Sequence, residues 1–236
     1  MKSFLAGNPE LRLALNEELV IGKRGGTSRY GVVELDDCNF HDCVRLDEWD
    51  EAKVMAFQPP DGEFVLMNYR MTSAFRAPFR VFPFIELRSP YVVEVVLKIR
   101  ADIPEQNHGS KITIEFPVPK DTTSVSHEWG HDTKRGSTKE HLVEYIAKDK
   151  KVVWRVKKWP GGQEFSLRLK LNLTASRTSG NAKKELGPVS MEFEVPMYNV
   201  SGLQVRYLRI MLSDTRYNPY RWVRYVTKSS SYVCRV

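Results

Sequence analysis

The chain has 236 residues, of which 42% are apolar and 28% charged, a balance that is typical of a soluble globular protein and excludes a disordered chain. Lysine and arginine exceed aspartate and glutamate by 36 − 29 = 7, so either an anionic partner or a solvated basic surface accounts for the charge. No apolar run approaches the roughly 18 residues that span a bilayer. The N-terminus lacks a signal-peptide pattern and the cysteines are few, so we expect a cytosolic protein without disulfides.

Alternation of apolar and polar residues predicts β-strands along most of the chain. Leu11–Val20 has the spacing nearest to an amphipathic helix, yet its Leu11, Leu13 and Leu15 favour a strand. Tyr91–Ile99 is almost continuously apolar, which predicts a strand that is buried on both faces. Four later segments alternate with period two: Lys111–Phe116, Val152–Lys157, Ser166–Leu173 and Ser190–Val195.

Turn signals separate these predicted strands. Proline and glycine cluster at residues 59–62, 117–119, 159–162 and 187–188. Many short strands between turns predict antiparallel sheets packed as a sandwich, and therefore an all-β fold class. Three polar stretches that contain glycine are expected to form surface loops: Gly22–Arg29, His127–Lys139 and Ala175–Lys184.

The sequence shows no converging catalytic or metal-binding set. Gly22–Ser28 contains glycine, lysine and threonine without the order of a phosphate-binding loop. Cys38, His41 and Cys43 suggest metal ligands, but along a single strand the two cysteines face opposite sides. Because a structural zinc site needs four ligands, we predict no metal and no cofactor, and we interpret the cysteines as small buried side chains. We also predict that the chain is not an enzyme.

Six segments carry a specific resemblance to a known family. They read DDCNFHDCVRLD at 36–47, QPPDGEFVLMNY at 58–69, PFRVFP at 78–83, GPVSMEFEV at 187–195, SGLQVRYLR at 201–209 and RWVRYVT at 221–227. In this order and spacing, the whole chain resembles the mu homology domain of clathrin-adaptor medium chains. The stretches CNFHDCVRLDEW at 38–49 and YNPYRWVRY at 217–225 are most similar to the medium chain of the fourth adaptor complex.

The resemblance implies a fold and a domain organisation. Mu homology domains are elongated, two-lobed antiparallel β-sandwiches in which the second lobe is inserted into the first. The first lobe would comprise residues 1–84 and 197–236, and the inserted second lobe would comprise residues 85–196. Medium chains also have an N-terminal domain that joins them to the other adaptor subunits, and this sequence does not include it.

The resemblance also implies a function. The chain would be the cargo-recognition subunit of a heterotetrameric vesicle-coat adaptor. It would be cytoplasmic and peripheral on trans-Golgi network, endosome or coated-vesicle membranes. A mu-homology scaffold module of a non-tetrameric endocytic or coat protein is the main alternative. A β-rich hydrolase is a weaker alternative, because it needs two converging acidic residues in a cleft.

The cargo site of the family lies on two late strands and binds Tyr-x-x-Φ signals, where Φ is a bulky apolar residue. By their positions in the motifs, the matching residues here are Lys2, Val205, Leu208, Arg221, Trp222, Val223 and Arg224. An extended cargo tail would add a strand beside Arg221–Tyr225, and the tyrosine and Φ would point to opposite sides. Trp222 and Arg224 would hold the tyrosine, and Val223 with the stem of Arg221 would hold Φ. Alternatively, the indole is a core side chain and the guanidinium a solvated edge charge.

In the family, a Phe-x-Asp strand precedes the lysine and completes the tyrosine pocket. The present sequence begins at Met1, after the position that such a strand would occupy. We therefore expect weak or absent binding of Tyr-x-x-Φ peptides by this chain alone, and an unpaired sheet edge.

A second signal site is also implied. Fourth-complex medium chains take tyrosine-based signals on another face, where Phe40 matches an aromatic residue and Asn68 stands in place of an arginine. The alternative for Phe40 is a packed strand residue.

Basic residues cluster in the expected inserted lobe. Alternation places Arg155 and Lys157 on the strand face opposite Trp154 and Val156. Together with Lys158 they are candidates for contact with anionic phospholipid, and a solvated charged face is the alternative. No motif accompanies them that would indicate nucleic-acid binding.

Overall fold

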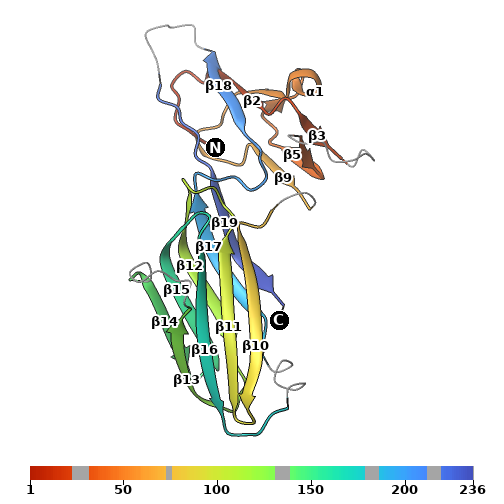
Figure 1. Ribbon diagram of the computed structural model, residues 1–236. Helices are drawn as coiled ribbons and strands as arrows, with labels where there is room; N and C mark the ends of the chain where they lie inside the picture. Colours follow the sequence, from red (N-terminus) through yellow and green to blue (C-terminus); the bar gives the residue numbers. More distant parts are fainter. Residues whose placement is uncertain (23–31, 73–75, 131–138, 179–185, 212–218, 236) are drawn as a thin grey trace. The chain divides into compact units, whose positions relative to one another are not determined.

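The computed structural model describes residues 1–22, 32–72, 76–130, 139–178, 186–211 and 219–235. The chain divides into two compact units, whose strands are shown in Figure 1. Unit 1 comprises Met1–Arg76 and Asn199–Arg224, and unit 2 comprises Ala77–Tyr198 and Tyr225–Val236. Strands dominate both units, which confirms the all-β prediction. The one helix in the described ranges is the four-residue α1 (Trp49–Ala52).

Unit 2 is a sandwich of two antiparallel sheets. One sheet has the order β10-β11-β16-β13, with β10 (Phe79–Ser89), β11 (Val92–Ala101), β16 (Glu164–Leu173) and β13 (Thr122–Trp129). The other has the order β14-β15-β12-β17-β19, with β14 (His141–Ile146), β15 (Lys151–Pro160), β12 (His108–Pro117), β17 (Val189–Pro196) and β19 (Val226–Cys234). The inner faces of both sheets contribute to one core.

Period-two alternation builds this core. On β16, Leu167, Leu169 and Leu171 are fully buried, as their spacing predicts. Leu169 lies opposite Val95 on β11, which is also fully buried. Val96, on the outer face of β11, is only half-buried. The prediction that this strand is buried on both faces is therefore wrong, because the sandwich covers only one face of each sheet.

Unit 1 is built from smaller sheets. The four-stranded sheet has the order β18-β2-β7-β6, with β18 (Val205–Met211), β2 (Glu10–Leu15), β7 (Val54–Phe57) and β6 (Val44–Arg45). Three two-stranded ribbons pair β1 (Lys2–Ser3) with β8 (Gly62–Glu63), β3 (Leu19–Ile21) with β4 (Val33–Leu35), and β5 (Asp37–Phe40) with β9 (Met67–Arg70). The pairing of β3 with β4 is parallel, which differs from the antiparallel pairing expected throughout.

Three segments differ locally from their predictions, two because of turns that alternation does not reveal and one because a strand continues into a polar stretch. Leu11–Val20 contains the end of one strand and the start of another, since β2 ends at Leu15. The stretch from Cys38 to Val44 is interrupted after Phe40, so the two cysteines do not share one strand. β13 runs through His127 to Trp129, where a loop is predicted. Most of the other two predicted loops, at 22–29 and 175–184, lies outside the described residues.

The bounds of the two units differ from the expected lobe boundaries at residues 84/85 and 196/197. Residues 77–84 belong to unit 2, because β10 is one continuous strand from Phe79 to Ser89. Residues 225–236 also belong to unit 2, because β19 pairs with β17 from Val226 to Cys234. The main segment of unit 2, residues 77–198, is inserted in the sequence between the two segments of unit 1. The last segment of the chain, residues 225–236, then returns to unit 2.

The described part of the chain has no helix with the length and apolar character that crossing a bilayer requires.

Candidate peptide-binding site

Strand β18 forms one side of the four-stranded sheet of unit 1. Within the described residues it pairs with β2 alone, so its other edge has no strand partner there. Its register places Val205 opposite Leu15 and Leu208 opposite Leu13. Both β18 side chains are half-buried and pack against the core of unit 1.

A bulge in β18 explains how Val205 and Leu208 share a face. Residues that differ by an odd number point to opposite sides of a regular strand. Between Val205 and Tyr207 the register shifts, so that the strand has one extra residue, Arg206, relative to β2. The Arg206 guanidinium donates to the carbonyl oxygens of Leu15 and Ala52, at 2.5 and 2.6 Å, and forms an ion pair with Glu17. The extra residue is thereby held outside the apolar face.

An apolar cavity of about 440 Å³ adjoins the start of β18. Its lining is Met1, Leu13, Leu15, Met55, Glu63, Phe64, Val65, Leu66, Met67, Tyr69, Leu203 and Val205. Leu13, Leu15 and Met55 are buried and form part of the unit 1 core, whereas Val65 is 64% exposed. The cavity therefore connects the core of unit 1 with solvent, and it has the size and character of a pocket for one apolar side chain or a small ligand.

Lys2 lies on β1, beside this cavity lining. In the register of β1 and β8, Lys2 is directly opposite Glu63, and its Nζ lies 3.1 Å from Glu63 Oε2. The pairing continues at Met1, whose carbonyl oxygen accepts a hydrogen bond from the Phe64 amide at 2.9 Å. Both charged side chains are mostly exposed, so the ion pair is open to solvent.

The segment that was expected to receive a cargo tail is exposed but is not a strand. Residues 219–225 have no strand assignment, and β19 begins only at Val226. The reason is that no described strand pairs with this stretch. Trp222 is 64% exposed and Val223 40%, so the alternative that Trp222 is a core side chain is wrong. Arg221 and Arg224 are also exposed.

The seven predicted cargo-site residues all fall in unit 1. The structure brings Val205 and Glu63, the ion-pair partner of Lys2, to one cavity. It places Leu208 on the same face of β18 as Val205. Trp222 and its neighbours line neither of the two cavities described in this section.

The residues of the second predicted site lie on one ribbon. Strands β5 and β9 place Phe40 opposite Met67, and Asn39 opposite Asn68. The Phe40 ring packs edge-on against Trp49, with 4.8 Å between ring centroids. Asn68 is exposed, and its Oδ1 accepts a hydrogen bond from the Asn39 side chain at 3.2 Å.

The basic side chains of β15 are arranged as predicted by alternation. Trp154 and Val156 are buried, whereas Arg155 and Lys157 are exposed, as is Lys158. Arg155 forms an ion pair with Glu144 at 2.5 Å. In the described residues, Lys157 and Lys158 have no ion pair.

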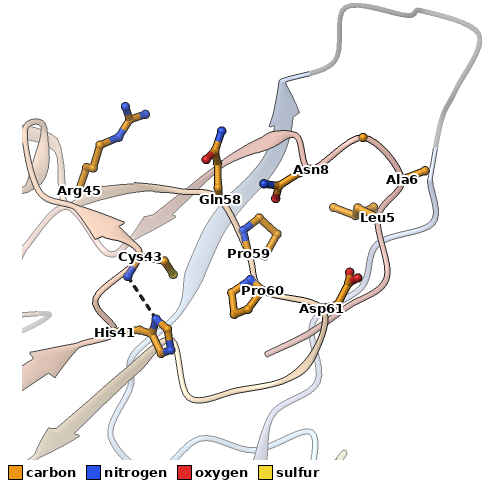
Figure 2. Close-up of a pocket in the computed structure, with 11 residues that line it drawn as sticks. Leu5, Ala6, Asn8, His41, Cys43, Arg45, Gln58, Pro59, Pro60 and Asp61 are labelled. Carbon is orange, nitrogen blue, oxygen red and sulfur yellow. Dashed lines mark hydrogen bonds between the residues drawn. The ribbon is translucent and has the colours of Figure 1, made fainter.

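A larger cavity, of about 860 Å³, contains none of the predicted cargo-site residues (Figure 2). His41 and Cys43 line it, and the His41 Nδ1 accepts a hydrogen bond from the Cys43 amide at 3.2 Å. Burial raises the pKa of the Cys43 thiol, which keeps it protonated. Arg45, which also lines the cavity, forms an ion pair with Glu10. No cluster of three candidate metal ligands occurs among the residues that the structure describes.

Residues 1–236 match the family described as "Adaptor complexes medium subunit family". The chain belongs to this family. Membership agrees with the predicted resemblance and with the prediction that the chain is not an enzyme. The chain is 49% identical over 244 residues to the AP-4 complex subunit mu of Arabidopsis thaliana, covering 100% of this chain and 52% of that protein.

More distant medium subunits match over the same extent. The AP-2 complex subunit mu of Dictyostelium discoideum is 32% identical over 246 residues, covering 100% of this chain and 54% of that protein. The chain thus spans about half the length of the curated relatives that it matches. Among solved structures, the Fcho1 mu homology domain of Danio rerio with a bound Eps15 peptide has a TM-score of 0.61 at 13% identity, covering 96% of this chain and 79% of that one. That likeness shows a mu homology fold.

The sequence did not predict two parts of the candidate peptide-binding site. It did not find the β18 bulge, because no glycine or proline marks Arg206. It also did not find Glu63, which lies within the PPDGEF motif that supports the family resemblance. A cross-strand register for Lys2 would have revealed Glu63, but a two-residue strand gives no alternation from which to deduce it.

Proposed function

We propose that this chain is the cargo-recognition domain of a vesicle-coat adaptor medium subunit and binds Tyr-x-x-Φ signals in cytosolic tails. The main support is β18, which places Val205 at an apolar cavity whose lining also includes the ion-pair partner of Lys2, and which has a strand partner on one edge only among the described residues. Family membership supplies the adaptor context. The other adaptor subunits are the proposed partners, and the proposed location is the cytoplasmic surface of trans-Golgi network, endosome or coated-vesicle membranes.

The chemistry of the residues suits the two ends of such a signal. The apolar Φ side chain would enter the cavity beside Val205, with Leu208 and Val223 as further apolar surface. Transfer of one such side chain from water contributes roughly 1.5–3 kcal/mol. The exposed Trp222 indole would stack on the tyrosine ring, and Lys2 and Arg224 would contact its hydroxyl. Arg221 would pack its aliphatic stem beside Φ.

The test is an NMR titration of the 236-residue chain with a Tyr-x-x-Φ peptide, which detects even millimolar affinity. Trp222→Ala should abolish the shifts, because it removes the stacking surface, and Val205→Asp should abolish them by placing a charge at the cavity. Tyr220→Ala is the matched control, because Tyr220 is an aromatic residue 87% exposed on the same segment. Undiminished binding by both site variants would contradict the proposal.

A scaffold role outside tetrameric adaptors is the alternative to an adaptor subunit. Co-purification of the full-length protein with large adaptin chains would support the tetrameric assembly. Their consistent absence from the purified protein would favour the scaffold role.

A second proposed contact is with anionic phospholipid through β15. Lys157 and Lys158 are exposed. Neither forms an ion pair with another described residue, so both charges can face an anionic surface. Arg155 would add to the contact when its pairing with Glu144 is exchanged. Binding to phosphatidylserine-containing vesicles should fall about fivefold for each lysine replaced by glutamine, since each cation near such a surface contributes about 1 kcal/mol. Equal sedimentation of the wild type with phosphatidylcholine vesicles would contradict this contact.

The ribbon of β5 and β9 is proposed as a second face for tyrosine-based signals. It brings Phe40 and Asn68 onto neighbouring strands. Because the Phe40 ring already packs on Trp49, a signal would meet the exposed Asn68 end first. Asn68→Arg should strengthen binding of an acidic tyrosine peptide, which a titration of both proteins would measure.

A further inference from the structure

Two phenylalanines are exposed on the outer face of β10 in unit 2, where alternation would place polar side chains. Phe82 is 39% exposed and Phe84 is 55% exposed. Val96, directly opposite Phe84 on the neighbouring β11, is half-buried on the same face. The Arg80 guanidinium lies over the Phe82 ring, 5.7 Å from its centroid. A cluster of exposed aromatic and apolar side chains on an outer sheet face is typical of a contact with another protein.

The strand register arranges the charged side chains of this face in two rows, one on each side of the phenylalanines. On β10, β11 and β16 in turn, the row beyond Phe82 consists of Arg80, Arg100 and Glu164. On the same three strands, the row beyond Phe84 consists of Glu86, Glu94 and Lys170. The two rows therefore carry opposite charges on every strand.

A second copy of the same face is the partner that fits this charge pattern. Two sheets can pack face to face with their strands nearly aligned. When a two-fold axis runs across the strands, each strand lies over its equivalent in the other copy and the order of the rows is reversed. The pairs that then meet are Arg80 with Glu86, Arg100 with Glu94, and Glu164 with Lys170. The axis passes between Phe82 and Phe84, so each Phe82 ring lies over a Phe84 ring of the second copy.

We propose that the chain forms a two-fold symmetric dimer through this outer face of β10, β11 and β16. The phenylalanines form the apolar centre of the contact and the charged rows form its rim, which is the usual anatomy of a protein interface. The aliphatic stem of Lys98, which lies opposite Phe82, packs on Val96 of the second copy. The proposal does not depend on the cargo function.

Ion pairs within one copy leave the rows with opposite net charge. Asp102 pairs with both Arg80 and Arg100, so one positive charge remains on these two strands. Arg88 pairs with both Glu86 and Glu94, so one negative charge remains at the other row. The remaining cation near Glu94 is Arg168, which also lies directly opposite Glu128 on β13. Because ion pairs between exposed side chains are weak, they can be exchanged for pairs across the interface.

The experiment measures self-association of the 236-residue chain by sedimentation velocity from micromolar to millimolar concentration. The wild type should show a monomer–dimer equilibrium that added salt weakens, because exposed charges are screened. Phe84→Ser should weaken the dimer about tenfold or more, since a few buried aromatic residues carry most of the binding energy of an interface. Leu142→Ser is the matched control, because Leu142 is 51% exposed on β14 in the other sheet of unit 2. This control should associate as the wild type does.

A charge exchange tests the orientation of the two copies. Glu164→Lys and Lys170→Glu should each weaken the dimer about fivefold, because each places like charges opposite one another at two symmetric positions. The chain with both substitutions should regain the wild-type association. An equimolar mixture of the two single variants should form a heterodimer, since each supplies the charge that the other lacks. Glu164 and Lys170 are both exposed, so these changes should leave the fold intact, which circular dichroism checks.

The outcomes decide the dimer and its face separately. A chain that sediments as a monomer at every concentration would overturn the dimer. A dimer that Phe84→Ser leaves unchanged would overturn its assignment to this face. If Phe84→Ser does not fold, the charge variants decide. Single reversals that have no effect, or whose effect neither the double variant nor the mixture restores, would overturn the two-fold arrangement proposed for this face.

Discussion

His141 is a histidine enclosed by aromatic rings in unit 2. Its ring centroid lies 4.7 Å from that of Phe165 and 5.5 Å from that of Trp129. Trp154 Nε1 donates a hydrogen bond to His141 Nδ1 at 3.3 Å, so the imidazole is an acceptor there and is neutral. Burial lowers the pKa of His141 from its ordinary value near 6.5 to about 4, because the surroundings do not solvate a charged ring.

This histidine should make stability depend on pH. The unfolded chain takes up a proton at His141 below about pH 6.5, whereas the folded chain resists it until about pH 4. Its contribution is therefore present above pH 6.5 and is lost as the pH falls from 6.5 toward 4. Urea unfolding of His141→Phe across this range should show a shallower decline than the wild type. His127→Phe, at an exposed ring, is the control and should keep the wild-type slope.

Asp102 is a carboxylate with a side chain only 3% exposed, between two arginines. Arg80 donates to both of its oxygens, with Nη2 at 3.0 Å from Oδ1, and Arg100 Nε lies 3.3 Å from Oδ1. Asp102→Asn should lower the free energy of unfolding by about 2 kcal/mol, because it removes the charge of a buried carboxylate that accepts hydrogen bonds from half-exposed arginines. Glu86→Gln makes the same change at an exposed ion pair and should cost less than about 1 kcal/mol. Equal losses in urea titrations would contradict this account.

At the scale of elements, the β18 bulge positions the proposed cargo surface. Arg206 holds the extra residue through the carbonyl oxygens of Leu15 and Ala52. Arg206→Ala should destabilise the bulge by about 1–2 kcal/mol, the range of lost charged hydrogen bonds, and should speed amide exchange along β18. Arg209→Ala is the control, because Arg209 lies on the same strand and its guanidinium lies over the Tyr207 ring, 4.6 Å from the centroid. Slower or unchanged amide exchange along β18 in Arg206→Ala would show that Arg206 does not hold the bulge in place.

At the scale of the whole molecule, the two units have cores of different size. The apolar core of unit 2 is drawn from both sheets of a sandwich, whereas that of unit 1 is drawn from one small sheet and short ribbons. Because stability within a structure follows buried apolar contacts, amides of β11 and β16 should exchange more slowly than those of β2 and β7. Hydrogen exchange read by mass spectrometry measures this. Equal protection in both units would show that they unfold together.

The sequence predicted the larger features of this chain because they depend on side-chain periodicity. Alternation identified β16 and the buried face of β15, and motif order identified the medium-subunit family. It also selected Val205 and Leu208, which the structure places on one face of β18. Periodicity could not show that the outer face of β11 is partly exposed to solvent. A continuous apolar run has the same pattern in a strand that is buried on one face and in a strand that is buried on both.

The sequence by itself determined the fold class, the family and the residue types available to bind a peptide. Only the tertiary structure decided where those residues meet. The bulge at Arg206, the register that sets Lys2 against Glu63, and the enclosure of His141 by aromatic rings all depend on contacts between segments far apart in the chain. The physical reason is that alternation is a local property of one strand, whereas register, bulges and cavities arise from the packing of one strand against another.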